Sequence, residues 1–481
     1  MGFFSKRSPA IEGCKERNDV DGLIKALKNG DHDKKLESAK ALGDLNDEKA
    51  VIPLIVSLRD IYHWSILQGR LDTVSGKRTD SSKSVQAFQD SIADALVQIG
   101  EKSVEILLQY LANVYMNHEM VISDVRHFLL LHQQTGVTLQ ELNNELNNFK
   151  DYVYKILIKI GDPSIRPLIQ RLRISGAGKE FNVSISMEMF AEKALAGIGR
   201  AAMDPLIAAL PYASEDLERR SIIQILGDIG NAQIIKHVLP SLDDANPFTR
   251  QDALRTLRKV ADLSIADSII KALSDKTAFV REEAIRTLCI LKAKDSTTEL
   301  IKCLEDADDD VRKEAAIAIG ELGDQSVADA LILALSDKNY SVREEAARSL
   351  GKLGGEKASE PLIKMLDDEE RRVRESSASA LSKLRNELAL EILLERFGKN
   401  EGRDKYEIGV ALDGLRDDSG ISLLSQFLKH KSVNVRVGTL RALARIRNLA
   451  ALSAVKTAIN DENDSVRGEA ESIFKNWEKL P

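Results

Sequence analysis

Apolar residues recur along this chain with a period of 31 residues. The dipeptide Val-Arg marks the period, at Val280-Arg281, Val311-Arg312, Val342-Arg343, Val373-Arg374, Val435-Arg436 and Val466-Arg467. Seven residues after each of these arginines stands a large apolar residue, and three residues after it usually stands a small one. Apolar positions four residues apart mark one face of a helix. The pattern therefore predicts an array of helices whose small side chains let neighbouring helices approach closely.

Each period is predicted to hold two helices. In the unit that begins at Ser341, residues 342–354 form the expected first helix and residues 357–368 the second. Gly354 stands where the first helix needs a left-handed stop. Pro361 falls in the first turn of the second helix, where its missing N–H costs nothing.

The period is regular in the second part of the chain and irregular in the first. Extra sequence separates the recognisable units of the first part, and a short segment precedes them. The predicted organisation is an N-terminal tail at 1–19, irregular repeats at 20–185 with insertions at about 61–84, 114–148 and 173–186, and regular repeats at 186–481 that end in a capping helix.

An aspartate stands six residues before the arginine in most units. The pairs are Asp244 with Arg250, Asp275 with Arg281, Asp306 with Arg312, Asp337 with Arg343, Asp368 with Arg374, and Asp461 with Arg467. A carboxylate in the turn between repeats can then meet guanidinium groups that project from the stacked first helices, in bidentate contacts. We interpret this ladder as structural, and not as a catalytic or anion-binding site.

Two units near the C-terminus depart from the ladder. Lys399 and His430 occupy their aspartate positions. We expect a weaker ladder there, and with it a softer joint or a bend. In the last helix, Trp477 and Leu480 are expected to cover the exposed end of the core, as terminal repeats of a solenoid must.

The Asp…Val-Arg spacing, the A-x-x-x-L-G-x-L-G run and the pattern of the second helix resemble HEAT repeats, from about Ser186 to the end and over residues 20–59. The short period resembles the phycobilisome-lyase-type HEAT subclass, since other HEAT units are nearer ~40 residues. The resemblance implies an all-α fold, an α-α superhelix (a HEAT-type α-solenoid) of about 12–13 two-helix repeats. It says little about activity.

Composition and charge narrow the function classes. The formal charge is −7, so the basic excess usual for a general nucleic-acid surface is missing. The odd set Cys14, Cys289 and Cys303 shows no metal-type spacing and fits a reducing compartment. No apolar stretch reaches the length of a signal peptide or a spanning helix. We expect a cytoplasmic monomer without an integral membrane segment.

The first insertion carries an unusual group of side chains. Aromatic and basic residues of this kind could hold a phosphate, a nucleic acid or an acidic peptide. A tryptophan that covers a helix end above a loop is the plainer interpretation. The residues are His63, Trp64, Arg70, Lys77 and Arg78.

The second helices supply a second candidate surface, which we expect to line the concave face of the solenoid. Their equivalent outward positions form a varied series, which suits an irregular protein partner better than a uniform polymer. The series is Lys271, Lys302, Leu333, Lys364, Glu395, Gln426 and Thr457. The favoured function is a non-catalytic scaffold that binds a protein through this face and the N-terminal insertions, with Lys271, Lys302 and Lys364 as candidate contacts.

Enzyme functions are the alternatives that the resemblance suggests. HEAT-like deoxyhypusine hydroxylases hold two irons with several His-Glu pairs, whereas this chain offers only His118-Glu119. A bilin lyase role lacks an obvious chromophore pocket, and nucleic-acid binding rests on the 61–84 loop alone. The sequence thus yields no catalytic, cofactor-binding or metal-binding residue, and we expect no cofactor.

Overall fold

The computed structural model describes residues 8–60, 81–116, 139–173, 179–260, 262–323, 325–399 and 405–478. In these ranges the backbone forms α-helices and short 3-10 turns without any strand, so the predicted all-α fold is confirmed. The chain divides into two compact units, Met1–Ser241 (unit 1) and Leu242–Pro481 (unit 2). None of the described helices is long and apolar enough to cross a membrane.

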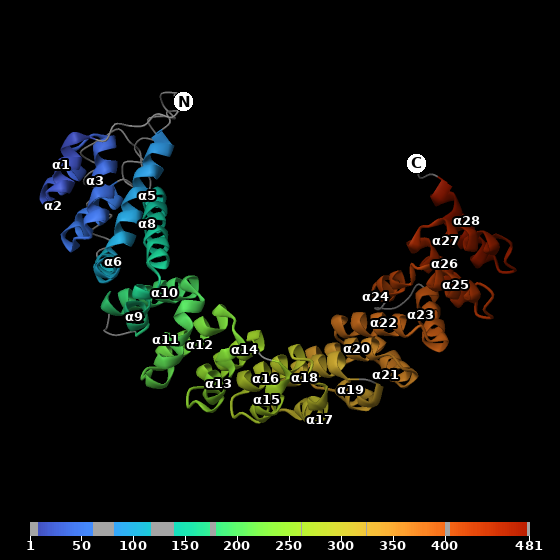
Figure 1. The fold of residues 1–481 in the computed structure, drawn as a ribbon. Helices are drawn as coiled ribbons and strands as arrows, with labels where there is room; N and C mark the ends of the chain where they lie inside the picture. Colours follow the sequence, from blue (N-terminus) through green and yellow to red (C-terminus); the bar gives the residue numbers. More distant parts are fainter. Residues whose placement is uncertain are drawn as a thin grey trace. The chain divides into compact units, whose positions relative to one another are not determined.

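Unit 1 contains the irregular repeats and the first of the regular ones (Figure 1). Its helices are α1 (Pro9–Glu16), α2 (Val20–Asn29), α3 (His32–Leu45), α5 (Ser81–Ile99), α6 (Glu101–Met116), α8 (Leu139–Ile160), α9 (Asp162–Gln170), α10 (Lys179–Ile198), α11 (Arg200–Ala209), α12 (Asp216–Ile229) and α13 (Ile235–Val238). Residues 51–60 are also helical.

Part of the segment predicted as a tail is a packed helix. Helix α1 lies against α2 and α3. Ile11 is buried there, and the Ser8 N–H donates to Glu37 at 2.8 Å. The reason is local: Pro9 starts the helix without losing a hydrogen bond, and Ile11 gives it an apolar contact.

The predicted insertions are described only at their edges. Residues 81–84, 139–148 and 179–186 form the first turns of α5, α8 and α10. Most of the remaining insertion sequence lies outside the described residues.

Unit 2 contains the remaining regular repeats. Its helices are α14 (Pro247–Val260), α15 (Ala266–Ala272), α16 (Ala278–Ile290), α17 (Thr297–Lys302), α18 (Asp309–Leu322), α19 (Ala328–Ala334), α20 (Tyr340–Leu353), α21 (Ser359–Lys364), α22 (Arg371–Leu384), α23 (Glu387–Lys399), α24 (Lys405–Leu412), α25 (Asp418–Phe427), α26 (Val433–Ile446), α27 (Leu449–Thr457) and α28 (Asp464–Glu478). We call α14, α16, α18, α20, α22, α24, α26 and α28 the Val-Arg helices. The others are the second helices. Figure 1 shows α15, α17, α19 and α21 as a separate row on the outer side of the curve of unit 2, so the expectation that the second helices line the concave face is wrong, and α14, α16, α18, α20 and α22 lie on the inner side instead.

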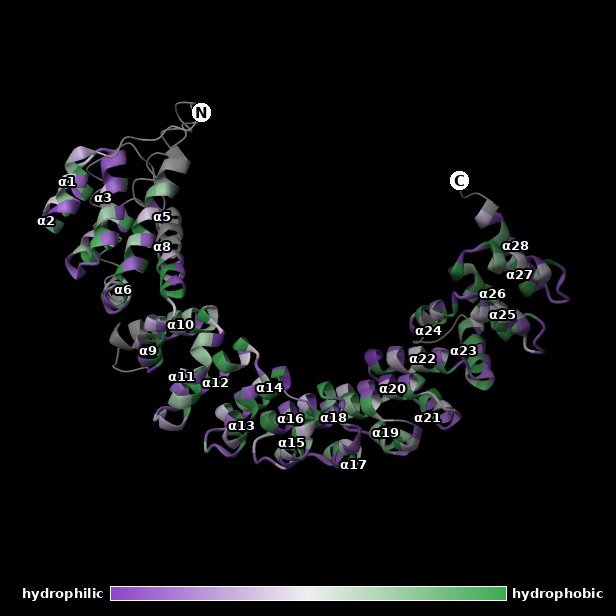
Figure 2. Cartoon of the chain, viewed as in Figure 1, coloured by the Kyte–Doolittle hydropathy of each residue, from purple (hydrophilic) through white to green (hydrophobic). Residues whose placement is uncertain are grey.

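The core of unit 2 is built from buried apolar residues of both rows. Figure 2 shows that hydrophobic and hydrophilic residues are mixed along each helix. The large apolar residue seven positions after the arginine is fully buried at Leu257, Leu288, Ile319, Leu350 and Leu381. Small residues let Val-Arg helices touch. A Cβ on Gly351 would stand 2.7 Å from the Cα of Ala380 in the next helix. The residue that ends α20, Gly354, has the positive φ of 74° that the sequence predicts for a helix stop.

Candidate functional site

The arginines of the Val-Arg helices bind aspartates of the following repeat. In the regular pairs, the guanidinium binds one carboxylate through two nitrogens, Nε and Nη2. For Arg281 the distances to the carboxylate of Asp306 are 2.7 and 2.6 Å. For Arg343 the distances to Asp368 are 2.8 and 2.9 Å. Within the described ranges, the Arg–Asp pairs of this kind are Arg250–Asp275, Arg281–Asp306, Arg312–Asp337 and Arg343–Asp368.

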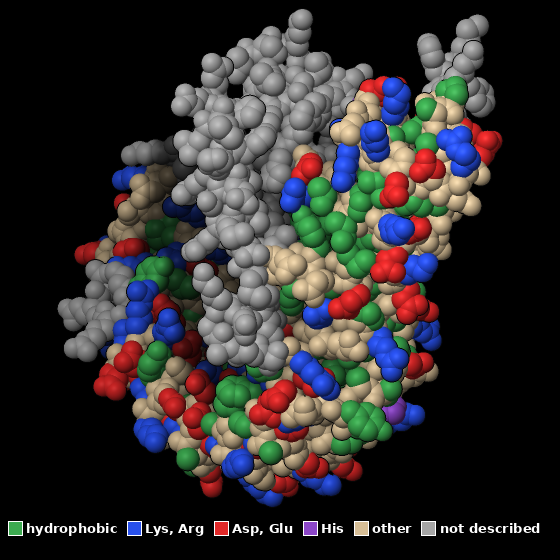
Figure 3. All heavy atoms as spheres, turned by 90° about the vertical axis from the view of Figure 1, so that its left-hand side faces the viewer, with side chains coloured by type: hydrophobic (Ala, Val, Ile, Leu, Met, Phe, Trp, Pro, Cys, Tyr) green, Lys and Arg blue, Asp and Glu red, His purple; other side chains and the backbone are tan. Residues whose placement is uncertain are grey.

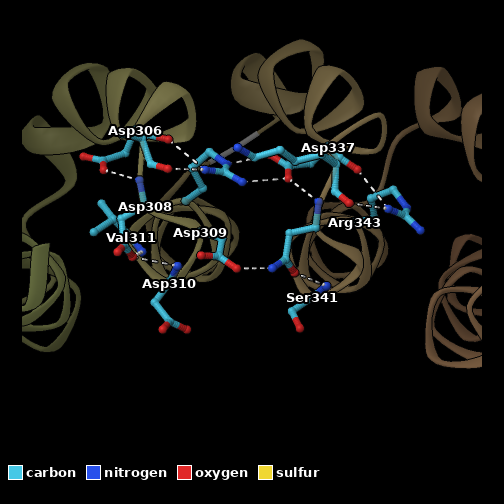
Figure 4. A network of polar contacts seen from close by, with 12 residues as sticks. Asp306, Asp308, Asp309, Asp310, Val311, Asp337, Ser341 and Arg343 are labelled. Carbon is cyan, nitrogen blue, oxygen red and sulfur yellow. Dashed lines mark hydrogen bonds and ion pairs between the residues drawn. The ribbon is translucent and has the colours of Figure 1, made fainter.

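The third nitrogen of each arginine binds its own turn. Nη1 of Arg312 donates to the backbone carbonyl of Asp306 at 2.8 Å. The carboxylate of Asp306 also accepts the backbone N–H of Asp308 at 2.9 Å (Figure 4). The aspartate six residues before an arginine therefore meets it through the backbone, while its carboxylate serves the arginine of the preceding repeat. One aspartate thus ties two repeats and a turn together.

Burial and pairing act in opposite directions on these carboxyl groups. Burial alone would raise the pKa of Asp306, but the guanidinium of Arg281 and the N–H of Asp308 hold the pKa below its ordinary value. The pKa values of Asp275, Asp337 and Asp368 are lowered for the same reasons. These aspartates are ionised at neutral pH, with their oxygens already used.

The outer members of the predicted set are bound differently. Nη1 of Arg374 donates to the carbonyl of Asp368 at 3.0 Å, but no aspartate follows, and its Nη2 lies 3.4 Å from Glu407. Asp461 accepts from Arg436 at 2.9 Å, and its carbonyl accepts from Arg467 at 2.7 Å. At the other end, the carbonyl of Asp244 accepts from Arg250 at 2.9 Å.

A second set of ion pairs joins the same helices, and sequence reasoning missed it. In each pair, an arginine five positions after the aspartate-binding arginine of one helix binds a glutamate of the next Val-Arg helix. That glutamate stands two positions after the corresponding arginine of its own helix. These Arg–Glu pairs are Arg255–Glu283 at 3.1 Å, Arg286–Glu314 at 3.2 Å and Arg441–Glu469 at 3.2 Å. The signal was available as recurring Arg and Glu columns, but both are interrupted and therefore inconspicuous.

The predicted partner-binding residues of the second helices are exposed. Lys302 and Lys364 pair within their own helices, with Glu299 at 2.8 Å and Glu360 at 3.2 Å. Lys271 is also exposed, and Leu333 presents 77 % of its surface. The predicted residues His63, Trp64, Arg70, Lys77 and Arg78 lie outside the described part of the chain, as does His118-Glu119.

Charges of both signs are mixed on the face of the molecule that Figure 3 shows, where acidic and basic side chains of the described residues are interspersed. Within the described ranges, no group of three or more His, Cys, Asp or Glu residues could hold a metal ion. Burial raises the pKa of Cys303 to about 11, which makes this thiol a poor nucleophile at neutral pH.

The repeat around Lys399 is rearranged. Helix α23 packs backbone to backbone against α26, since a Cβ on Gly398 would stand 1.8 Å from the carbonyl oxygen of Asn434. Arg441 donates to the carbonyls of Phe397 and Gly398 at 3.1 and 3.0 Å. Helix α23 therefore packs closely on α26, which belongs to the repeat after that of α24.

Comparison with known proteins gives one family. The model for HEAT repeats matches overlapping segments, at residues 203–289, 242–309, 266–336, 297–382, 329–413 and 390–473, which together span more than half of the chain. No curated protein matches significantly.

Several solved structures are similar at low identity. The complex of CpcE and CpcF of phycocyanin lyase from Nostoc sp. PCC7120 is 21% identical, with 50% of this chain and 94% of that chain covered and a TM-score of 0.31. Human deoxyhypusine hydroxylase in complex with glycerol is 24% identical, with 52% and 97% covered and a TM-score of 0.25. An engineered protein is 16% identical, with 96% and 100% covered and a TM-score of 0.28. These values are too low to carry an activity over to this chain.

Proposed function

This chain belongs to the HEAT-repeat family, and from that premise we propose that it is a non-catalytic scaffold that binds a protein partner. Stacked helical repeats form extended surfaces suited to such a role. In unit 2, the buried charges serve the packing of repeats, because the Arg–Asp and Arg–Glu pairs use them to join neighbouring helices. The side chains left for binding are those that point outward.

The observation that carries the proposal is the exposed outward series on the second helices. Lys271, Lys302 and Lys364 lie on α15, α17 and α21, and Leu333 on α19 is an exposed large apolar residue among them. Lys302 and Lys364 form ion pairs within their own helices, and such exposed pairs contribute little to stability. They are therefore available to a partner at small cost. Apolar and charged side chains together suit a mixed protein interface.

The proposal extends to location. Cys14, Cys289 and Cys303 are all free thiols, which supports a reducing, cytoplasmic setting.

The test compares two triple charge reversals. The full chain is isolated from its native cells, and the bound protein is identified by mass spectrometry and then titrated against each variant. One variant carries Lys271→Glu, Lys302→Glu and Lys364→Glu. The matched control carries Lys259→Glu, Lys352→Glu and Lys383→Glu, three exposed lysines of the Val-Arg helices.

We expect the first variant to weaken binding at least about tenfold and the control to bind as wild type. Loss in the control alone would move the interface to the Val-Arg helices. Stoichiometric metal or a bound pigment on the purified chain, with turnover of a substrate, would overturn the scaffold role.

A further inference from the structure

The described part of α24 begins at Lys405, directly after residues outside the described ranges, and ends at Leu412. Among the described residues of α24, three apolar side chains are buried: Ile408, Ala411 and Leu412. Tyr406 and Val410 are 63% and 47% exposed. The hydrophobic stabilisation from this described part is correspondingly small.

Neither the regular Arg–Asp pair nor the regular Arg–Glu pair forms between α22 and the described part of α24. The aspartate that Arg374 would bind is replaced by Lys399, whose Nζ binds Glu395 of its own helix at 3.3 Å. The arginine that Glu407 would bind is replaced by Ser379, the fifth residue after Arg374. Arg374 therefore lacks its regular aspartate partner, and Glu407 lacks its regular arginine partner.

Arg374 and Glu407 contact each other, but the contact is long. Arg374 and Glu407 are 8% and 4% exposed, and the contact between them is 3.4 Å long. The same oxygen of Glu407 lies 3.5 Å from Nε of Arg371, a contact that is just as long. Nε of Arg374 and Oε2 of Glu407 have no hydrogen-bond partner among the described residues. Buried charges with incomplete pairing favour opening over closure.

A pocket of about 290 Å³ that is partly open to solvent lies beside the contact between α22 and α24, and its lining residues include Ser379, Ser382, Val410 and Ala411. At the equivalent contact of α18 with α20 the helices touch, since a Cβ on Gly320 would stand 2.2 Å from Oγ of Ser349. Side chains that line the pocket make fewer dispersion contacts across it than side chains in direct contact would.

On the side toward α26, α24 also lacks a regular ion pair. In the pattern of Arg–Glu pairs, α24 would carry an arginine at position 410 and α26 a glutamate at position 438. The residues there are Val410 and Gly438, so this pair is missing too. Gly438 instead lies against α23, where a Cβ would stand 2.0 Å from the carbonyl oxygen of Leu394. Further ties of α24 are peripheral: Arg371 lies on the ring of Tyr406 at 5.2 Å, and the Arg445–Asp413 pair forms just beyond the end of the helix.

We infer that α24 is a detachable helix, which opens from unit 2 while α22, α23 and α26 stay folded. The contacts of α23 with α26 hold the array together across the opened repeat. Helix α24 is then the conformational switch of the solenoid, and its release uncovers the apolar surface that Ile408 and Leu412 cover. This inference does not depend on which partner the scaffold binds.

The test is hydrogen exchange of the full chain, read by mass spectrometry. We expect amides of α24 to exchange at least about tenfold faster than those of α20 and α26. Ser379→Arg supplies Glu407 with the arginine that three other repeats have. It should slow exchange in α24 about tenfold and leave α20 unchanged.

The matched control is Ile317→Arg, the same position of α18, where the side chain is only half-buried. The glutamate that the new arginine would face, Glu345, is already bound by Arg348, so exchange in α20 should not slow. Protection of α24 equal to that of α20 in the wild-type chain would overturn the inference. So would joint exchange of α22, α23, α24 and α26 as one unit, or an α24 rate that Ser379→Arg leaves unaltered although circular dichroism shows the variant folded.

Discussion

At the scale of single residues, the arginine of the Val-Arg helix is fixed by three separate contacts. Nε and Nη2 of Arg281 bind the next aspartate, and Nη1 binds the carbonyl of Asp275 at 2.8 Å. Lysine could not make these contacts, because its single ammonium group lacks the planar fork of a guanidinium. The aspartate is equally constrained, since a longer side chain could not bind the arginine and the N–H two residues ahead at once.

Asp306→Asn should lower the free energy of unfolding by about 2 kcal/mol, because it removes a charge that two guanidinium nitrogens and one backbone N–H bind. Chemical denaturation followed by circular dichroism measures this. Asp329→Asn is the control, since its pair with Lys357 is exposed at 3.4 Å and should be worth close to nothing. Equal midpoints for the two variants would contradict the structural role of the Arg–Asp pairs.

The sequence identifies the residues of these contacts but not their connections. Asp306 stands six residues before Arg312 and 25 after Arg281, and the pattern alone does not say which arginine its carboxylate binds. The Arg–Glu pairs were not predicted from the sequence, because Ile317 and Ser379 interrupt the column of arginines that form them. The proposed contacts at Lys271, Lys302 and Lys364, and at His63 and Trp64, stay predictions.

At the scale of helices, the packing of α23 on α26 depends on two glycines. Gly398 and Gly438 bring the two backbones into contact, and neither position tolerates a Cβ without movement of the other helix. This contact could not be predicted from the 31-residue period, because the two glycines occupy different columns of the repeat. The replacement of aspartates by Lys399 and His430 predicted a softer joint. In the structure, Lys399 binds Glu395 of its own helix at 3.3 Å, and His430 lies 3.2 Å from Glu391 of α23.

Gly438→Ala should destabilise unit 2 by about 1–3 kcal/mol, because the new methyl group overlaps the carbonyl of Leu394. The thermal unfolding midpoint reports the change. Gly468→Ala in α28 is the matched control: its Cβ would meet nothing within 4 Å, and alanine should stabilise that helix by up to about 1 kcal/mol. A Gly438→Ala variant as stable as wild type would show that α23 does not lie against α26.

At the scale of the whole molecule, repeats contact mainly their neighbours. The free energy of unfolding is therefore approximately a sum of contributions from the repeats and from the contacts between adjacent repeats. Each regular junction of unit 2 adds an apolar contact, such as Leu350 or Leu381, and a buried ion pair. The apolar part does not depend on pH, whereas the ion pairs do. The four Arg–Asp pairs should therefore give unit 2 a common acid sensitivity.

The pKa values of Asp275, Asp306, Asp337 and Asp368 are lower in the folded chain than in the unfolded one, because arginine and backbone N–H groups outweigh burial. The unfolded chain consequently takes up protons first as pH falls, and the stability from these pairs is present above about pH 4 and lost below it. The unfolding midpoint of the wild-type chain should fall steeply between about pH 5 and pH 3. Asp306→Asn, which lacks one of the four carboxylates, should lose less over the same interval, so its deficit at neutral pH should shrink in acid. A deficit that is constant from neutral pH to pH 3 would mean that Asp306 titrates alike in both states, and that Arg281 does not bind its ionised form.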